Sequence, residues 1–249
     1  MKTLKHMKGC LLVLPLLLLV ACNAGNSSEA VPEGGLYAEF SQGMPEGFEA
    51  SDGWSNGSMF NVTWRAGNVT FKGGSMQLII DSDEASGSGI PYSGGEFRST
   101  GFYGCGRYEV SMKAIKNDGV VSSFFTYTGP SDNNPWDERD VEILGKDTTK
   151  VQFNYFTNGK GNHEYMHDLG FDASEGFHTY AFEWYEDRIV WLVDGAEVHS
   201  VSENIPVTEG KIMMNAWCGV GVDGWLNAFD DGNMPLTAEY QWVRFTPFD

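Results

Sequence analysis

Short segments of alternating apolar and polar residues follow one another along most of this chain, separated by clusters of Gly, Asn, Asp and Pro. Residues 107–113, 151–155 and 188–193 show this alternation, which is typical of strands with one buried and one solvated face. Asp194-Gly195 lies between two such segments, and both residues tolerate positive φ, so we expect a hairpin there. No stretch has a long helical period. The pattern predicts an all-β antiparallel sandwich.

Residues 1–21 differ from the rest of the chain. Three lysines precede a leucine-rich run that ends at Val20, and this run is shorter than the roughly 20 apolar residues of a membrane span. We predict a signal peptide. Ala21-Cys22, directly after the run, is typical of a bacterial lipoprotein, so Cys22 is the predicted lipid anchor and the only predicted membrane contact. An ordinary signal peptide with an incidental Cys22 is the alternative; the protein is exported in both cases. Asn23 is compatible with sorting to an outer membrane.

Residues 22–35 are polar and contain Pro and Gly, which predicts a flexible tether. Residues 36–249 have a suitable length for one sandwich domain and show no internal repeat. Two cysteines, Cys105 and Cys218, fall in this domain. The sequence leaves open whether they pair, because it does not give their separation.

The chain is strongly acidic, with a formal net charge of −18. Removing the three lysines of the signal peptide takes this charge to −21. Such a surface repels nucleic acid and anionic lipid. Aromatic residues make up 14% of the chain and include eight tryptophans. A good half of these must pack in the core, and we expect the others to stack on sugar rings in a polar cleft.

Glu138, Asp140 and Glu142 alternate along one segment, WDERDVEILG at residues 136–145. On a strand, their three carboxylates face the same way. Glycoside hydrolysis uses one carboxylate as nucleophile and one carboxylic acid as proton donor, and crowding would raise the pKa of one member while another stays ionised. A solvated acidic face and a cation site built from the same carboxylates are the alternatives, and spacing alone does not decide among them.

The segment WDERDVE resembles the Glu-x-Asp-x-Glu signature of family 16 glycoside hydrolases, and specifically of the bacterial lichenases, which are endo-β-1,3-1,4-glucanases. The resemblance covers nearly the whole domain, in lichenase order. It extends to FFTYTGP at 124–130, GKDTTKVQFNY at 145–155, LGFD at 169–172, FHTYAF at 177–182 and GKIMMN at 210–215.

The resemblance implies a jelly-roll fold with a concave cleft and a retaining mechanism, with Glu138 as nucleophile, Asp140 as assisting carboxylate and Glu142 as general acid/base. It implies a β-glucan substrate, a monomer and no required cofactor. It also implies these substrate-binding residues: Asn56, Glu96, Arg98, Phe125, Tyr127, Trp136, Asn154, Trp217 and Trp225. We expect Trp217 and Trp225 in a glycine-rich loop at the rim.

The sequence departs from this family at several positions. Arg139 stands where isoleucine is usual and points between the sheets, so we expect it to find a carboxylate, reach solvent or distort the strand, and to reduce stability or activity relative to Arg139→Ile. Val62 and Gly94 replace a frequent disulfide. Phe156 replaces a frequent cleft tyrosine. Gln241 replaces an aspartate that helps to bind a structural calcium, which makes a calcium site doubtful.

Residues 163–167 match H-E-x-x-H, a zinc motif that requires a helix. Turn-rich sequence on both sides argues against a helix, so we expect no zinc site here. Two rival functions remain from the sequence: a surface lipoprotein that binds glycans without cutting them, and a laminarinase that prefers β-1,3-glucan. The intact pair Glu138 and Glu142 favours an enzyme.

Overall fold

The computed structural model describes residues 31–83 and 87–248. The predicted signal peptide, the anchor Cys22 and most of the predicted tether lie outside these residues, so those predictions stay predictions. Among the described residues, no helix is long and apolar enough to cross a membrane.

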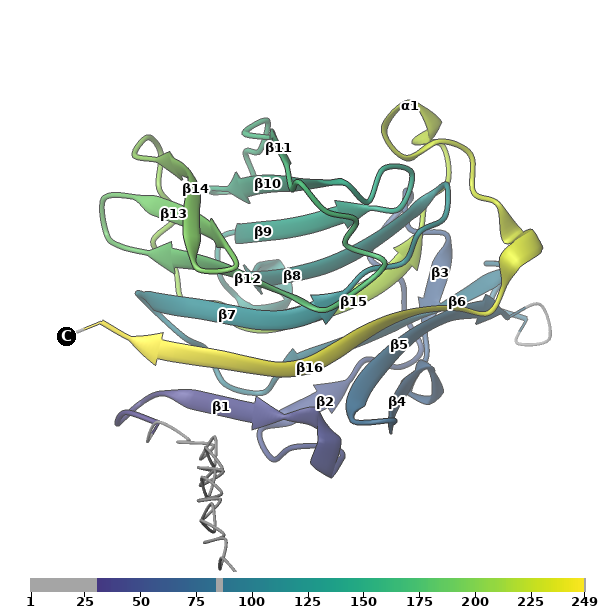
Figure 1. Cartoon of the computed structure of the whole chain (residues 1–249), viewed down its shortest axis with the longest axis horizontal. Coiled ribbons are helices and arrows are strands. Elements are labelled where there is room, and N and C mark those ends of the chain that lie inside the picture. The colour runs from purple at the N-terminus through teal and green to yellow at the C-terminus, as the bar shows by residue number, and fades with distance from the viewer. Residues whose placement is uncertain (1–30, 84–86, 249) are drawn as a thin grey trace, which may run out of the picture. The chain divides into compact units, whose positions relative to one another are not determined.

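Strands of the first layer form an antiparallel sheet, in the order β11, β10, β9, β8, β15, β6 and β2 (Figure 1). Their bounds are β11 Tyr165–Asp168, β10 Lys150–Phe156, β9 Asp137–Leu144, β8 Val120–Thr128, β15 Lys211–Cys218, β6 Tyr92–Ser99 and β2 Phe48–Ala50. Strand β3 (Val62–Trp64) runs parallel to β6. Adjacent strands thus come from distant parts of the chain, as the neighbours β8 and β15 do.

The second layer continues from the first through the pairing of β5 with β6 and runs in the order β5, β16, β7, β12, β13 and β14. Strand β4 pairs with β5, and β1 pairs with β16. The bounds are β1 Leu36–Glu39, β4 Val69–Lys72, β5 Ser75–Ser82, β7 Gly106–Lys113, β12 His178–Trp184, β13 Ile189–Val193, β14 Ala196–Val201 and β16 Leu236–Pro247.

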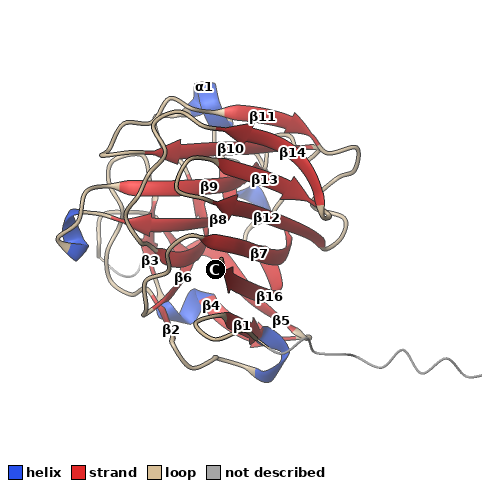
Figure 2. Ribbon diagram, turned by 90° about the vertical axis from the view of Figure 1, so that its left-hand side faces the viewer, coloured by secondary structure: helices blue, strands red, loops and turns tan. Residues whose placement is uncertain are grey.

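Helical segments are short in the described residues. They are η1 Phe40–Gln42, η2 Ala66–Asn68, η4 Pro130–Asp132, α1 Asp223–Leu226 and η5 Asp231–Asn233. The two layers of curved strands pack face to face, with the helical segments at the periphery (Figure 2). The predicted all-β jelly-roll sandwich is confirmed.

Side chains of the first layer alternate between the core and the open face, because successive strand residues point to opposite sides. On β8, Phe124 is fully buried, whereas Phe125 and Tyr127 line a cleft on the open face. A hydrogen bond joins the two layers where Nε1 of Trp191, on β13, donates to the carbonyl of Asp140, on β9, over 3.1 Å. The core therefore supports the cleft strands directly from behind.

Tryptophans divide evenly between core and surface. The side chains of Trp64, Trp184, Trp191 and Trp217 are buried, and the other four are at least partly exposed. The expectation that about half would pack in the core is confirmed.

The predicted hairpin at Asp194-Gly195 is also confirmed. Val193 pairs with Ala196, and the two turn residues have φ values of 47° and 80°, as a two-residue turn that matches the strand twist requires.

Cys105 is half-buried, Cys218 is buried, and both are free thiols. Val62 and Gly94, where the resemblance implied that a disulfide is replaced, lie close together on the paired strands β3 and β6. A Cβ at Gly94 would lie 3.0 Å from Cγ2 of Val62 and 2.8 Å from the carbonyl oxygen of Ala216. Apolar contact and a close backbone approach therefore take the place of a covalent link.

Candidate active site

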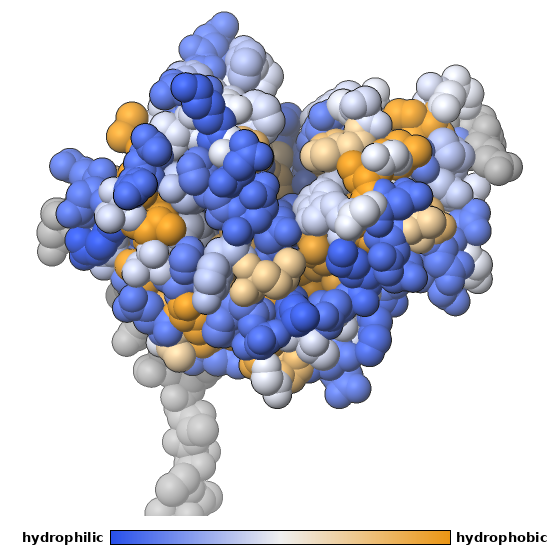
Figure 3. Space-filling model, turned by 90° about the horizontal axis from the view of Figure 1, so that it is seen from above, coloured by the Kyte–Doolittle hydropathy of each residue, from blue (hydrophilic) through white to orange (hydrophobic). Residues whose placement is uncertain are grey.

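The open face of the first layer is hollowed into a cleft of about 940 Å³ (Figure 3). All twelve residues that the sequence predicted for catalysis or substrate binding line it. The cleft also contains residues that the sequence analysis did not assign to the site: Trp54, Met59, Phe60, Ser123, Ser131, Asp132, Gln152, Glu164, Lys211, Met213 and Asn215.

The three acidic residues occupy alternate positions of β9, which is central in the cleft floor. Glu138 pairs with Tyr127 of β8, Asp140 with Phe125, and Glu142 with Ser123. Because paired residues of neighbouring strands point to the same side of a sheet, each carboxyl is flanked by a cleft residue. The three carboxyls face the cleft together, as the alternation predicted.

Glu138 accepts a hydrogen bond of 2.6 Å from the indole N–H of Trp136. A second hydrogen bond joins it to the carboxyl of Asp140. Burial raises the pKa of Glu138 to about 7, and these two hydrogen bonds oppose that rise. The pKa of Asp140 is raised well above its ordinary value, first by burial and then by the charges of Glu138 and Glu142. Asp140 therefore carries the proton that it shares with Glu138.

Glu142 accepts one hydrogen bond, 2.7 Å from Nε2 of Gln152 to Oε2. Burial raises its pKa to about 7 as well, and the negative charges of Glu138 and Glu164 add to the rise. The sequence led us to expect a raised pKa for only one member of the pair, through crowding. That expectation was wrong, because burial in the cleft floor acts on all three carboxyls and is the largest cause for each.

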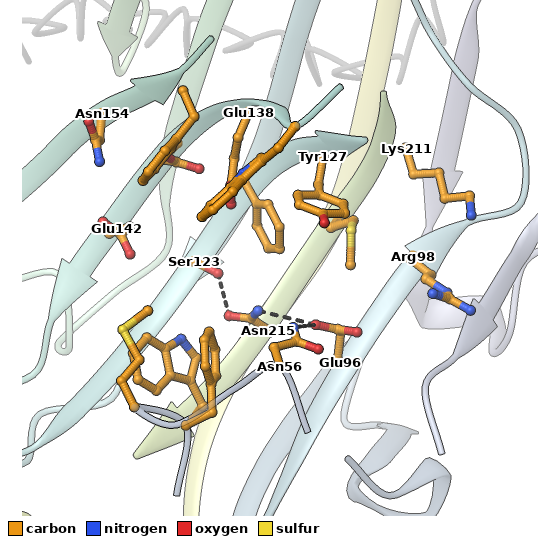
Figure 4. A pocket seen from close by; sticks show the side chains of 18 of the residues that line it. Asn56, Glu96, Arg98, Ser123, Tyr127, Glu138, Glu142, Asn154, Lys211 and Asn215 are labelled. Carbon is orange, nitrogen blue, oxygen red and sulfur yellow. Dashed lines mark hydrogen bonds between the residues drawn. The ribbon is translucent and has the colours of Figure 1, made fainter. Parts of the chain in front are cut away.

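Glu96, on β6, is the centre of a buried polar network in the cleft floor, separated from β9 by strands β8 and β15 (Figure 4). It accepts hydrogen bonds from Oγ of Ser51 at 2.7 Å, Nδ2 of Asn56 at 3.2 Å and Nδ2 of Asn215 at 3.4 Å. Ser123 extends the network by donating to Oδ1 of Asn215 over 2.6 Å. Burial raises the pKa of Glu96. The network fixes carboxylate and amide groups of the kind that bind sugar hydroxyls.

Aromatic rings form the walls of the cleft. Trp136 stacks on Phe156 with ring centroids 4.7 Å apart. On the other side, Trp217 packs 4.0 Å from Phe60 and is only 2% exposed. Trp217 lies on β15, so its expected place in a rim loop was wrong: the strand continues through it to Cys218. Trp225 does lie in the segment after β15, on α1.

Charged and polar groups at the cleft are paired with neighbours. Arg98 forms an ion pair with Glu49 at 2.8 Å and lies over the ring of Trp54. Lys211 forms an ion pair with Asp132 at 2.8 Å. Figure 4 shows Arg98 and Lys211 on one side of the cleft, away from Glu142.

Asn154 is held by the backbone. Its Oδ1 accepts hydrogen bonds from the N–H groups of Tyr155 at 2.9 Å and His163 at 3.3 Å. It pairs with Asp140 across β10 and β9, so this amide faces the central carboxyl from the neighbouring strand.

Arg139 points between the layers, as predicted, and is fully buried. Among the described residues it pairs with no carboxylate, it does not reach solvent, and it leaves the pairing of β9 with β8 and β10 regular, so the three expected ways of accommodating its charge were wrong, while the expected effect on stability or activity stays a prediction. Instead, Nη2 donates to the carbonyl of Pro206 over 2.8 Å and Nη1 to that of Thr208 over 3.4 Å. The guanidinium lies 3.6 Å from the ring centroid of Trp184. Two carbonyls and an aromatic face thus replace a carboxylate partner.

The residues around Gln241 do not fit a strong calcium site. Its amide oxygen already accepts a hydrogen bond of 2.9 Å from Ser111. Within residues 31–83 and 87–248, no group of three His, Cys, Asp or Glu side chains could hold a metal ion. The H-E-x-x-H segment forms part of strand β11 and the irregular stretch before it, so the helix that a zinc site requires does not form.

The sequence and the fold are similar to those of known proteins. A xylanase/β-glucanase from Ruminococcus flavefaciens is 56% identical over 214 residues, which are 84% of this chain and 27% of that protein. A β-glucanase from Bacillus subtilis is 51% identical over 243 residues, which are 97% of this chain and 98% of that protein. The chain thus spans about a quarter of the first relative's length and nearly all of the second's.

A solved structure shows the same architecture. The crystal structure of a prokaryotic β-1,3-1,4-glucanase (lichenase) from a mouse hindgut metagenome matches with a TM-score of 0.83 at 52% identity, over 86% of this chain and 99% of that one. The family model for glycosyl hydrolases family 16 matches residues 56–244, a range that includes the three carboxyls of β9 and most of the cleft. The chain therefore belongs to glycosyl hydrolase family 16, the family that its acidic strand predicted.

Proposed function

We propose that this protein hydrolyses mixed-linkage β-1,3-1,4-glucan at internal bonds with retention of anomeric configuration. One observation carries the proposal: Glu138, Asp140 and Glu142 stand in a row on the floor of a cleft walled by tryptophans. The names of the relatives, β-glucanase and lichenase, support this substrate.

Glu138 is the proposed nucleophile because it has the donors that stabilise a carboxylate. The N–H of Trp136 and the proton on Asp140 both favour its ionised form. In the first step, an oxygen of Glu138 attacks the anomeric carbon, and the bond to the leaving glucose breaks. Asp140 remains beside the new ester and can return its hydrogen bond when the carboxylate reforms.

Glu142 is the proposed general acid/base because the negative charges around it favour its protonated form. Glu138 and Glu164 both raise its pKa. It donates its proton to the departing glycosidic oxygen. In the second step, it accepts a proton from water, which attacks the anomeric carbon and releases Glu138.

The cleft dimensions and lining support an endo-acting enzyme. A volume of about 940 Å³ is large for a site that binds one sugar ring. Trp136 on one wall and Trp225 on the other supply apolar ring faces, and Glu96, Asn56 and Arg98 supply polar groups for hydroxyls.

Reducing-sugar release from barley mixed-linkage glucan, laminarin and carboxymethylcellulose tests the proposal, with Glu138→Gln and Glu142→Gln as parallel controls. We expect release from the mixed-linkage glucan and a loss of at least about 1000-fold in each variant. Release from laminarin alone would make the protein a β-1,3-glucanase. Tight binding of glucan without release would make it a glycan-binding protein.

We also infer that the protein is exported as a monomer and attached to the cell envelope through lipid at Cys22. The leucine-rich run followed by Ala21-Cys22 supports this inference. Palmitate labelling of the full chain expressed in bacteria, compared with Cys22→Ala, should show label only in the parent. Light scattering of residues 36–249 should give the mass of a single chain, and a dimer mass would refute the monomer.

A further inference from the structure

Arg139 is a buried cation on the catalytic strand, immediately next to Glu138 in sequence and on the opposite face of β9. Burial lowers the pKa of its guanidinium to about 10, so it remains charged at neutral pH. Placing a charge in a protein core costs free energy unless the site compensates for it. The groups that contact the guanidinium therefore indicate the role of this buried charge.

The partners of Arg139 belong to the segment between β14 and β15. The guanidinium donates to the carbonyls of Pro206 and Thr208. From the same face of β9, Oδ2 of Asp137 accepts the N–H groups of Val207 at 3.1 Å and Thr208 at 3.0 Å. The side chains on either side of Glu138 thus hold both the carbonyls and the N–H groups of this segment.

Strand β10 holds the preceding part of the same segment. The hydroxyl of Tyr155 donates to the carbonyl of Glu203 over 2.8 Å, and Thr157, just after β10, donates to the carbonyl of Asn204. The segment is therefore attached to two neighbouring cleft strands along residues 203–208. This attachment restrains the end of β9 where Glu138 lies.

Charged and titratable groups surround Arg139 on several elements. Asp137 and Asp140 belong to its own strand, Tyr108 to β7, and Cys105 precedes β7. The neutral ring of Trp184, on β12, covers the guanidinium. Within the described residues, Nε of Arg139 has no hydrogen-bond partner. No carboxylate in the described part of the chain forms an ion pair with the guanidinium, and Asp140, on the cleft face of β9, is one of the charges that interact with it.

We propose that Arg139 is a positioning residue that anchors β9 to the Pro206–Thr208 segment and supplies a positive charge behind Glu138 and Asp140. The catalytic part of this inference rests on the proposed function. The electrostatic part is supported by the low dielectric of the protein between Arg139 and the two carboxyls, because charges interact more strongly there than in water. The charge of Arg139 lowers the pKa of both Glu138 and Asp140.

Other groups also act on the pKa of Glu138. They are Trp136 just before β9, Asp140 on β9 itself, Glu96 on β6, and Tyr127 on β8. Arg139 is thus one of several contributions to the pKa of Glu138, and the matched variants below measure its share.

Three variants separate charge from hydrogen bonding. Arg139→Lys keeps the charge with poorer geometry, Arg139→Gln keeps N–H donors without the charge, and Arg139→Met removes both. Arg107→Met is the matched control, since Arg107 forms its ion pairs with Glu109 and Glu183 in the second layer, away from the cleft.

The first readout is the titration of the Glu138 carboxyl by carbon-13 NMR, assigned with Glu138→Gln. We expect its pKa to rise by about half a unit in the Gln and Met variants and to stay near the parent value in the Lys and Arg107→Met proteins. The second readout is the pH profile of kcat/KM on mixed-linkage glucan, whose acidic limb should move by the same amount. KM should change little, because Arg139 does not line the cleft.

The inference would be overturned if the pKa of Glu138 were unchanged in Arg139→Gln and Arg139→Met and only the melting temperature fell. Arg139 would then have a structural role alone. If Arg139→Met does not fold, the Lys and Gln variants make the same comparison. The NMR titration does not need turnover, so a parent protein that fails to hydrolyse glucan refutes the proposed function alone.

Discussion

The indole N–H of Trp136 donates a hydrogen bond of 2.6 Å to Oε2 of Glu138, two residues further along the chain. Trp136 precedes β9, is 38% exposed and stacks on Phe156 at the cleft wall. One side chain therefore lines the cleft with an aromatic face and opposes the rise that burial causes in the pKa of the proposed nucleophile.

Replacing Trp136 by phenylalanine keeps a ring for stacking and removes the donor. A hydrogen bond to a charged group contributes about 1.5–3 kcal/mol, so kcat/KM should fall roughly 10- to 100-fold. Loss of the donor also raises the pKa of Glu138, and the acidic limb of the profile should move to higher pH. Phe156→Leu is the control: it weakens the stack and should raise KM without moving the limb. An acidic limb that stays in place in Trp136→Phe would contradict this role.

Glu164 should shift the basic limb of the pH profile, in addition to the larger effect of burial on Glu142. Its negative charge raises the pKa of Glu142, so Glu164→Gln lowers that pKa and moves the basic limb to lower pH. Glu164 is exposed, and salt at about 0.5 M should therefore remove most of the shift. Glu197→Gln, an exposed residue of β14, should leave the limb unchanged. A shift that persists in high salt would point to a contact rather than a charge effect.

The ionised carboxylate of Glu142 should reduce the stability of the folded protein at neutral pH and above. The pKa of Glu142 is raised from its ordinary value to about 7, so its neutral form fits the fold. Its favourable contribution is complete below the unfolded-state pKa and is lost as pH rises through about 7. At about pH 8, Glu142→Gln should raise the melting temperature by roughly 2–6 °C, and by less at about pH 4. Calorimetry at both pH values checks this, and an equal shift at both would contradict it.

Asp172 should show the opposite pH dependence. Hydrogen bonds from Lys116, Ser174 and Thr148 hold the pKa of its carboxyl below the ordinary value. Stability from a depressed pKa is present above the unfolded-state value and is lost as pH falls through the folded value. Asp172→Asn should therefore cost about 1–2 kcal/mol at neutral pH and progressively less below about pH 4. Urea unfolding at several pH values measures the difference. A cost that does not change with pH would rule out the charged contribution.

The acidic strand could be predicted because a period of two places Glu138, Asp140 and Glu142 on one face. The same rule could have found three residues that the sequence analysis missed. Ser123, Gln152 and Asn215 each stand two positions before a predicted cleft residue, namely Phe125, Asn154 and Trp217, and all line the cleft. Because these amide and hydroxyl side chains are uncharged, they form no charge pattern, and nothing else in the sequence marked them as cleft residues.

Burial and long-range contacts could not be predicted. The sequence indicated crowding among the carboxyls, but the largest cause of their raised pKa values is burial, which depends on the curvature of the assembled sheet. Likewise, the sequence identified Arg139 as unusual but not its partners, because the carbonyl of Pro206 lies 67 positions away along the chain. Pairing across such distances is fixed only by the packing of the two layers.

The central claim is that Glu138 attacks the sugar and Glu142 transfers the proton. Azide rescue of alanine variants, on an aryl glycoside of a mixed-linkage oligosaccharide, tests both roles in one measurement by NMR of the product. In Glu138→Ala, azide takes the place of the nucleophile, and we predict an α-glycosyl azide. In Glu142→Ala, azide attacks the glycosyl-enzyme formed on Glu138, and we predict a β-glycosyl azide. The reverse assignment of products, or an α-azide from both variants, would contradict the account.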